Sequence, residues 1–417
     1  MKPEMYNNKV PYDLIIAGAG PAGMMCAYTA AQRGLKVAVV DSNRTPGRKL
    51  RITGKGRCNL TNNCDIKKFM ENVPRNGKFL YSSVNAFPPS EVIDFFERNS
   101  LPLKTERGAR VFPVSDNAND VADTMERLCR DSKVVFLRDR IMRLLITDGV
   151  ICGVETQEKS IACRNVALCT GGLSYPLTGS TGDGHRLAAE AGHTVRSCRP
   201  SLVPLESSDR WCSEMQGFSL RNIRLTVFEN NKAIYSDFGE MLFTHFGVSG
   251  PVILSASAHM RNFDTAAYRL EIDLKPALDE KKLDARILRD FQKYSNREIK
   301  NALSDLAASS MIPVLIELSE IPEDTKVNSI TRQQREKLRD LFKKFPISVS
   351  GTRPIDEAIV TSGGVDVKEI DPRSMESKIV KGLYFAGEII DVDAYTGGFN
   401  LQIAWSTGRM AGESVTV

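Results

Sequence analysis

Residues 12–41 read YDLIIAGAGPAGMMCAYTAAQRGLKVAVVD. The apolar run at residues 12–17 predicts a strand buried in a parallel sheet, because both faces of such a strand are covered. A glycine-rich turn follows and opens a predicted helix that extends to about Gln32. Residues 36–40 predict a second strand. The order strand, helix, strand indicates a Rossmann-like α/β fold.

The turn between the first strand and the helix carries the pattern Gly18-x-Gly20-x-x-Gly23. The first glycine permits a tight turn, the second lets backbone approach a pyrophosphate, and the third lets helix and strand pack closely. Asp41 ends the second strand, where a carboxylate can accept hydrogen bonds from ribose hydroxyls. An ordinary tight turn is the alternative, but strand, helix and acid together favour dinucleotide binding. The pattern does not choose between NAD and FAD.

The other end of the chain favours FAD. Residues 382–388 (GLYFAGE) predict a short strand that ends in Gly387-Glu388, and the glycine-rich string 395–401 (YTGGFNL) leads into a helix. An acid at a strand end suits the ribityl hydroxyls, and the amides of a helix N-terminus suit a phosphate. A routine strand–turn–helix connection is the alternative. Together with the opening motif, this segment predicts one FAD held by both ends of the chain.

Three longer stretches of sequence point to a known family: GRKLRITGKGRCNLTN (47–62), GEMLFTHFGVSGP (239–251) and GEIIDVDAYTGGFNLQIAWSTG (387–408). With the glycine motif and the CTGG turn at 169–172, they resemble the glutathione-reductase-like class of flavoproteins. More narrowly, the chain is similar along nearly its whole length to the aminoacetone oxidase family of FAD-binding enzymes, which includes the BaiN-type flavoproteins. Lys55 stands where this family more often has glycine.

The resemblance implies a discontinuous FAD-binding domain, interrupted by an antiparallel β-barrel-like domain that itself carries a small helical insert. We expect the FAD-binding domain at residues 1–198 and 354–417, the β-barrel-like domain at 199–276 and 345–353, and the helical insert at 277–344. The sequence changes character at the same places, from alternating short strands to charged segments with helical periodicity such as DEKKLDARILRDFQKY.

The loop after the second strand is strongly basic. No acid occurs between Asp41 and Asp65, and the stretch holds Arg44, Arg48, Lys49, Arg51, Lys55 and Arg57. A solvated basic loop is the usual outcome for such a run. The resemblance favours a positive lining for the FAD diphosphate and for reduced flavin, with residues 57–59 near the ring.

The predicted FAD contacts are Gly18, Gly20, Pro21, Ala22, Gly23, Asp41, Ser42, Lys49, Gly54, Arg57, Cys58, Asn59, Ile141, Thr170, Gly171, Gly172, Asp183, Gly387, Glu388, Asp391, Gly398, Phe399, Asn400 and Leu401. Asp183, in the turn GSTGDG, could instead only cap the helix that follows. Among the four histidines, His245 is the candidate for proton transfer, because it lies in the family string FTHFGVSGP.

The cysteine pattern and the hydropathy indicate the cellular compartment and the absence of a membrane segment. Nine cysteines without a C-x-x-C pair fit reduced thiols in a cytoplasm. Cys58 and Cys64 are spaced C-x5-C, one residue longer than the pairs of flavin-linked disulfide reductases, which argues against a redox disulfide. No spacing suggests a metal site. No apolar run approaches the roughly 20 residues that span a bilayer, so we expect no membrane segment.

These features predict an FAD-dependent oxidoreductase that transfers two electrons to or from a small organic substrate. The resemblance supports amine oxidation with oxygen and reduction of a conjugated ketone with NAD(P)H as a transient reductant, and does not separate them. A flavoprotein acting on tRNA and a non-catalytic flavin-binding protein are the alternatives. Nucleic acid is disfavoured because the net charge is only +5 and the helical segment mixes acids with bases. The oligomeric state is left open.

Overall fold

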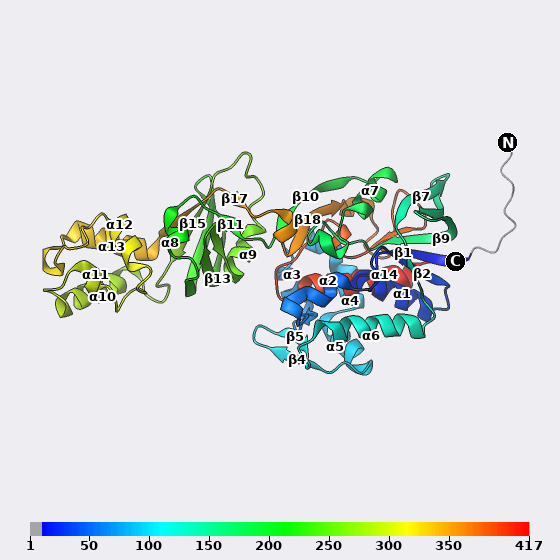
Figure 1. Cartoon of the computed structure of the whole chain (residues 1–417), viewed down its shortest axis with the longest axis horizontal. Helices are drawn as coiled ribbons and strands as arrows, with labels where there is room; N and C mark the ends of the chain where they lie inside the picture. The colour runs from blue at the N-terminus through cyan, green and yellow to red at the C-terminus, as the bar shows by residue number, and fades with distance from the viewer. Residues whose placement is uncertain (1–10, 417) are drawn as a thin grey trace. The chain divides into compact units, whose positions relative to one another are not determined.

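The computed structural model describes residues 11–416 and contains two compact units. The first unit combines the residues up to Ser201 with those from Ile355 onward, and the second is Leu202–Pro354 (Figure 1). Each unit has its own hydrophobic core. The three-part division expected from the sequence stays a prediction.

The first unit is built on a seven-stranded sheet with the order β6-β2-β1-β9-β8-β7, in which β19 also pairs with β9. Its strands are β1 (Tyr12–Ala17), β2 (Val37–Asp41), β6 (Val135–Arg138), β7 (Ile141–Thr147), β8 (Val150–Thr156), β9 (Ser160–Leu168) and β19 (Leu383–Phe385). The pairs β1–β2, β1–β9, β2–β6 and β9–β19 are parallel, whereas β7, β8 and β9 form antiparallel pairs. The carboxyl ends of five parallel strands, β6, β2, β1, β9 and β19, therefore meet at one edge of the sheet.

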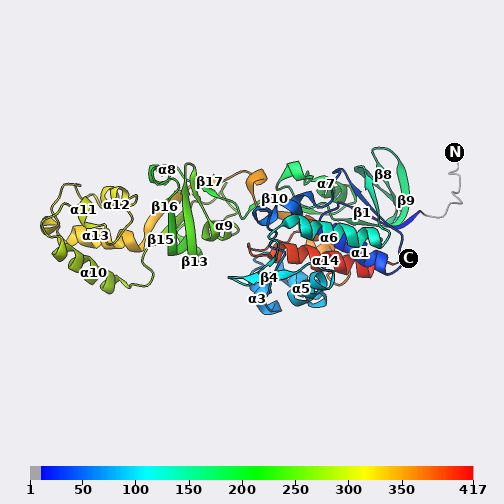
Figure 2. The same ribbon diagram turned by 60° about the horizontal axis from the view of Figure 1, so that its bottom comes forward.

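Helices and two small sheets complete this unit. The helices are α1 (Pro21–Gln32), α2 (Arg48–Ile52), α3 (Ile66–Glu71), α4 (Tyr81–Ala86), α5 (Pro89–Arg98), α6 (Ala118–Asp131), α7 (Asp183–Glu190) and α14 (Phe399–Ser414). The small sheets are β3-β5-β4, made of Thr61–Asn62, Arg110–Pro113 and Leu103–Glu106, and the antiparallel pair β10 (Val195–Ser201) with β18 (Val360–Val365). Figure 2 shows α1 beside both α6 and α14.

Small residues let α1 and α14 pack in close contact. A Cβ on Gly408 would lie 2.4 Å from the carbonyl oxygen of Ala22, and one on Gly412 would lie 2.6 Å from that of Cys26. No larger residue fits at these positions without moving the helices apart. This contact joins the beginning and the end of the chain in one unit.

The second unit contains an antiparallel sheet with the order β16-β15-β12-β13-β14-β11-β17. The strands are β11 (Leu205–Glu206), β12 (Ser219–Glu229), β13 (Lys232–Thr244), β14 (Gly247–Ser249), β15 (Tyr268–Asp273), β16 (Phe345–Val349) and β17 (Gly351–Thr352). Helices α8 (Arg210–Glu214) and α9 (Pro251–Ser257) accompany the sheet, and α10 (Glu280–Lys293), α11 (Ile299–Ala302), α12 (Ile312–Ser319) and α13 (Arg332–Lys343) lie between β15 and β16 in the chain. The parallel and antiparallel sheets confirm the predicted α/β fold class.

The described residues include no helix that is both long and apolar enough to cross a membrane.

A buried histidine ties three segments of the first unit together. In the His193 ring, Nδ1 lies 3.2 Å from the Glu369 carboxylate and Nε2 lies 2.8 Å from the Ser377 hydroxyl. The ring also forms a T-shaped contact with the ring of Phe385. Burial lowers the pKa of His193, although the Glu369 carboxylate opposes this shift. Burial also lowers the pKa of His185.

We predict that the protein loses stability as the pH falls from 7 to about 5.5, because the unfolded state binds protons on these histidines near the ordinary pKa of about 6.5 while the folded state resists them. Replacing His193 with Gln should flatten this slope in a melting-temperature series. His245→Gln, at an exposed position, is the matched control. An unchanged slope in the His193 variant would contradict the assignment.

Candidate functional site

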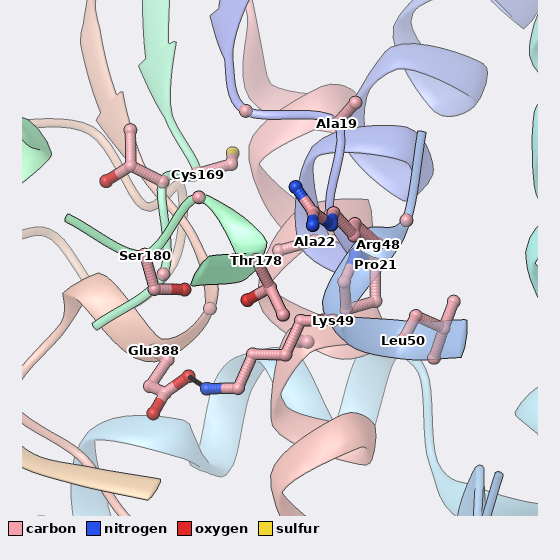
Figure 3. A pocket seen from close by; sticks show the side chains of 18 of the residues that line it. Ala19, Pro21, Ala22, Arg48, Lys49, Leu50, Cys169, Thr178, Ser180 and Glu388 are labelled. Carbon is pink, nitrogen blue, oxygen red and sulfur yellow. Dashed lines mark hydrogen bonds and ion pairs between the residues drawn. The ribbon is translucent and has the colours of Figure 1, made fainter. Parts of the chain in front are cut away.

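One pocket in the first unit collects the turns that follow the parallel strands. The segments after β1, β2, β9 and β19 all line it, as do the N-termini of α1 and α14 (Figure 3). Ligands of open α/β sheets bind at this edge, outside the carboxyl ends of the strands. The topology therefore assembles the pocket from both ends of the chain.

The three glycines of the opening motif have different surroundings. Gly18 has φ +101°, and a Cβ there would lie 2.6 Å from the carbonyl oxygen of Cys169; a Cβ on Gly23 would lie 2.0 Å from that of Gly18. Both glycines are thus required by the protein's own packing. A Cβ on Gly20 would meet nothing within 4 Å. The space beside Gly20 is open for a ligand.

Helix α1 begins at this open space without a side-chain cap. Its N-cap is Gly20, and its first turn contains no acidic residue. Helix α14 likewise begins at Gly398, which has φ +96°, with neither a side-chain cap nor an acid in its first turn. Uncapped N-termini leave backbone N–H groups free and carry a partial positive charge, so both suit the phosphate oxygens of a dinucleotide.

Two buried polar atoms in the lining have no partner within the protein. The side-chain oxygen of Asn59 and the hydroxyl of Thr170 are buried without a hydrogen bond, and both residues line the pocket. Buried polar atoms in folded proteins are normally paired. Together with the open space at Gly20, these orphaned atoms fit a polar ligand such as FAD.

Asp41 connects the end of β2 to the glycine turn. Its carboxylate accepts hydrogen bonds from the backbone N–H groups of Ala19 and Asn43, both at 2.7 Å. The side-chain amide of Asn43 also donates to the Thr178 carbonyl oxygen at 3.0 Å. The carboxylate lines the pocket, and a ribose contact through its remaining lone pairs stays a prediction.

A partly buried ion pair joins the basic loop to the C-terminal turn. The Lys49 ammonium lies 2.8 Å from the Glu388 carboxylate and donates to the Ser174 hydroxyl at 2.7 Å; Figure 3 shows Lys49 and Glu388 pointing toward one another. The Thr361 N–H donates to the other Glu388 oxygen at 2.8 Å. Burial would raise the pKa of Glu388, but the charge of Lys49 and these hydrogen bonds hold it below its usual value. Glu388 is therefore ionised and neutralised by Lys49.

Most of the predicted cofactor contacts come together in this lining. They are Gly18, Gly20, Pro21, Ala22, Asp41, Ser42, Lys49, Gly54, Asn59, Ile141, Thr170, Gly171, Asp183, Gly387, Glu388, Gly398, Asn400 and Leu401. Their individual contacts with FAD stay predictions.

Arg57 does not line the pocket and instead binds two acidic side chains. Its guanidinium contacts both Glu106 and Asp116 at 2.5 Å and stacks on the ring of Phe112 at 4.2 Å. It thereby attaches the loop to the β4–β5 hairpin and is absent from the pocket lining.

Five further predicted residues also lie outside the lining. Cys58 is fully buried, and burial raises the pKa of its thiol to about 12. Asp391 is paired with Arg75 through two hydrogen bonds of 2.5 and 2.7 Å, and the ring of Phe399 packs against Phe69. Gly23 and Gly172 are enclosed by packing, since a Cβ on Gly172 would lie 2.4 Å from the Thr361 hydroxyl.

The basic loop is thus partly neutralised by the rest of the fold. Arg51 pairs with Asp123 at 2.7 Å, and Lys49 and Arg57 have the carboxylate partners described above. Arg48 lines the pocket and donates to the neutral side chain of Asn43, and within the described residues no carboxylate pairs with it. Arg48, Pro21 and Ala22 all line the pocket (Figure 3). Arg48 is the basic side chain best placed to face the diphosphate.

The backbone of this loop gives a reason for the family's more frequent glycine at position 55. Gly54, Lys55 and Cys58 all have φ near +58°, and Gly56 has φ +83°. This left-handed region favours glycine because it lacks a Cβ. The more frequent glycine at position 55 therefore has a backbone reason.

Sequence reasoning missed several lining residues. They include Asn43, Arg48, Thr53, Arg140, Thr178, Ser180, Ile359 and Thr396. Asn43 could have been predicted from its place two residues after Asp41. Arg48 is predicted only as one member of the basic run. Arg140, which forms a double hydrogen bond with Asp183 at 2.8 and 2.6 Å, has no local signal, because its partner follows it by 43 residues.

His245 lies in the second unit, between β13 and β14. It is exposed, and its ring packs edge-on against Phe246. The pocket lining consists of residues from the first unit, so a proton-transfer role for His245 stays a prediction. All nine cysteines are free thiols. Across residues 11–416, no group of three or more His, Cys, Asp or Glu side chains is arranged to hold a metal ion.

The profile of the HI0933-like protein Rossmann domain matches residues 12–414. The chain belongs to this family. It is 29% identical over 402 residues to a ribosomal RNA dihydrouridine synthase of Escherichia coli, covering 95% of this chain and 96% of the relative. It is also 29% identical over 406 residues to a 3-dehydro-bile acid delta(4,6)-reductase of Clostridium scindens, covering 96% and 98%.

Among solved structures, the fold is similar to that of a 3-ketosteroid delta1-dehydrogenase from Sterolibacterium denitrificans, with a TM-score of 0.51, 12% identity, and coverage of 98% of this chain and 99% of that one. The family confirms FAD as the cofactor and the protein as an FAD-dependent oxidoreductase, and the similarity to the solved structure shows the fold. The matched family is broader than the aminoacetone oxidase resemblance, and the bile acid reductase is compatible with the BaiN-type branch.

We predict that Gly20→Val folds but fails to retain FAD. The new side chain meets no protein atom within 4 Å of its Cβ, so it projects into the space expected for the diphosphate. The check is the flavin absorbance of the purified protein beside its circular dichroism spectrum. A folded variant as yellow as the wild type would contradict the cofactor assignment at this turn.

We predict that Lys49→Met lowers the free energy of unfolding of the flavin-free protein by about 2 kcal/mol, because it leaves the Glu388 carboxylate, whose side chain is only 21% exposed, without its counter-charge. The double variant Lys49→Met/Glu388→Gln should recover part of this loss. Denaturant unfolding of the flavin-free forms measures both, since bound cofactor would add its own stabilisation. If Lys49→Met is as stable as the wild type, the pair does not stabilise the fold.

Proposed function

We propose that the protein is an FAD-dependent reductase that saturates a carbon–carbon double bond conjugated to a carbonyl group. The supporting observation is that two relatives similar over nearly the whole chain are named for different substrates and the same kind of change. Dihydrouridine is uridine with one ring double bond reduced, and a delta(4,6)-reductase acts on double bonds beside the 3-oxo group of its substrate. Both reactions require a hydride at the β-carbon and a proton at the α-carbon.

Bound FAD supplies hydride chemistry to such a reaction. The residues of this chain bind and orient it: the turn at 18–22 and the N-terminus of α14 receive negatively charged oxygens, and Arg48 adds a positive charge. The Lys49–Glu388 pair holds the basic loop against the C-terminal turn. In this proposal, Thr53, Gly54 and Asn59, together with the lining residues between 395 and 401, would hold the remaining part of bound FAD.

The electron donor in this proposal is NAD(P)H, which visits the flavin transiently. The chain contains a single Gly-x-Gly-x-x-Gly motif after a predicted strand, so no resident second dinucleotide is expected. Amine oxidation with oxygen as acceptor, the other branch of the sequence resemblance, is the alternative that the experiment must separate.

Two substrate sources share the required chemistry. A uracil base has a ring double bond conjugated to a carbonyl, and the ribosomal RNA dihydrouridine synthases of Escherichia coli and Haemophilus influenzae are each 29% identical to this chain. A 3-oxo-Δ4 steroid offers the same conjugated group in a small molecule. The same reaction class applies to both, and a turnover measurement with each compound distinguishes between them.

The test is anaerobic reduction of the purified flavoprotein, followed at about 450 nm, where oxidised flavin absorbs. NADH or NADPH should bleach the flavin, and a 3-oxo-Δ4 steroid or a uridine-rich ribosomal RNA fragment should restore the colour without oxygen. Mass spectrometry should then find a gain of two hydrogens in the substrate that restored it. Free FAD at the same concentration is the control.

Bleaching by a small primary amine, with peroxide formed on admitting air and no response to NAD(P)H, would overturn the reductase proposal in favour of an oxidase. Reduction by NAD(P)H with recovery by oxygen alone would overturn the proposed class of substrate.

A further inference from the structure

Helix α10 separates its charges between two faces. Its buried residues are Leu283, Ile287, Asp290 and Phe291, and successive residues of a helix are rotated by about 100°. Lys281, Lys282, Arg289 and Lys293 fall on the opposite half and are all exposed. The outward half contains these four cations and no acid, because Glu280, Asp284 and Asp290 lie on the other side of the helix.

The acids of α10 are engaged within the second unit. Asp284 accepts a hydrogen bond from Arg335 of α13 at 3.0 Å. Asp290 is 4% exposed and pairs with Arg286 at 2.8 Å. Asp284 and Asp290 are therefore turned inward, and Glu280 is exposed at the N-terminal end of the helix, outside the half that carries the four cations.

Two cations of the outward face have no carboxylate partner within the described residues, namely Lys281 and Arg289. Lys282 lies 3.5 Å from Asp279 at the helix N-cap, and Lys293 lies 2.8 Å from Asp305. These exposed pairs are weak and easily exchanged for other anions.

An aromatic residue, Tyr294, follows Lys293 at the C-terminal end of α10 and is partly buried against the core of the second unit. The Lys293 ammonium is 4.7 Å from the centroid of the Tyr294 ring, and the Arg297 guanidinium is 4.9 Å from it. The Tyr294 hydroxyl donates to Asp305 at 2.8 Å. Aromatic rings and guanidinium planes next to a row of cations are the surface on which single-stranded RNA bases stack while phosphates are neutralised.

We propose that the outward face of α10, together with Tyr294 and Arg297, is an RNA-docking surface. This inference rests on the proposed function in its RNA form, and it supplies what the sequence lacked: a one-sided basic stripe with an aromatic residue beside it. The residues assigned to phosphate contacts are Lys281 and Arg289, since their charges are not offset by a carboxylate.

The burial pattern favours RNA over a lipid surface. A helix that binds at a membrane interface inserts its apolar face between lipids. In α10 that face is packed in the core of the second unit, with Leu283 and Ile287 fully buried. The exposed face offers charge and a single large apolar residue, Leu288, which suits a phosphate backbone.

The test compares holoprotein carrying Lys281→Gln/Arg289→Gln with a control, Arg221→Gln/Lys232→Gln, which removes the same charge from exposed positions on β12 and β13. The probes are purified ribosomal RNA and a labelled single-stranded poly(U) of about 20 nucleotides. Fluorescence anisotropy across a salt series should show about tenfold weaker binding for the α10 variant. The magnitude of its slope of log K against log salt should decrease by about 1.4, which corresponds to the loss of two phosphate contacts on a single strand.

The control should bind as the wild type does. Equal binding by the α10 variant and the wild type, or no RNA binding by the wild type at low salt, would overturn the docking surface. Binding to vesicles of phosphatidylglycerol in place of RNA would overturn it as well. Flavin reduction by NAD(P)H and reoxidation by the 3-oxo-Δ4 steroid, measured on the same preparations, report separately on the reductase proposal.

Discussion

The first unit depends on how closely backbone approaches backbone around α1. A Cβ on Gly23 would lie 2.0 Å from the carbonyl oxygen of Gly18, and one on Gly408 would lie 2.4 Å from that of Ala22. Helix α1 is therefore held against the turn that precedes it and against α14 at contacts where only hydrogen fits. Because its N-terminus faces the pocket, this packing also sets where the free N–H groups point.

Electrostatics in the pocket result from pairing between distant parts of the chain. The basic loop that follows β2 would repel itself if it were isolated, but Glu388, Glu106, Asp116 and Asp123 approach it from other segments. The ion pair between Lys49 and Glu388 spans 339 residues of sequence. Positive charge remains where no carboxylate pairs with it, at Arg48 beside the glycine turn. Arg44 and Lys55 also lack a carboxylate partner among the described residues, but of the three only Arg48 lines the pocket, where its charge suits a diphosphate.

The proposed reaction and the proposed docking surface depend on different units. The flavin pocket is lined by residues of the first unit, and the basic face of α10 belongs to the second. Reduction of a conjugated double bond depends mainly on a positioned flavin, which fits a family whose members are named for different substrates. In this proposal, the choice of substrate comes from surfaces outside the pocket, where sequence constraints on the cofactor do not apply.

The sequence by itself determined the βαβ unit, the FAD motif and 18 of the 42 residues that line the pocket, because these depend on local patterns: an apolar strand, glycines at fixed spacing and an acid at a strand end. Even the more frequent glycine at position 55 has a local cause, the left-handed backbone of that loop. Only the tertiary structure decided that Arg57 faces Glu106 and Asp116, that Asp391 pairs with Arg75, and that Arg140 reaches the pocket. It also decided that the mixed charges of α10 separate into an inner acidic and an outer basic side. The reason is the same in each case: the partner of a charged side chain is chosen by contacts between segments far apart in the chain, and neither spacing nor composition records those contacts.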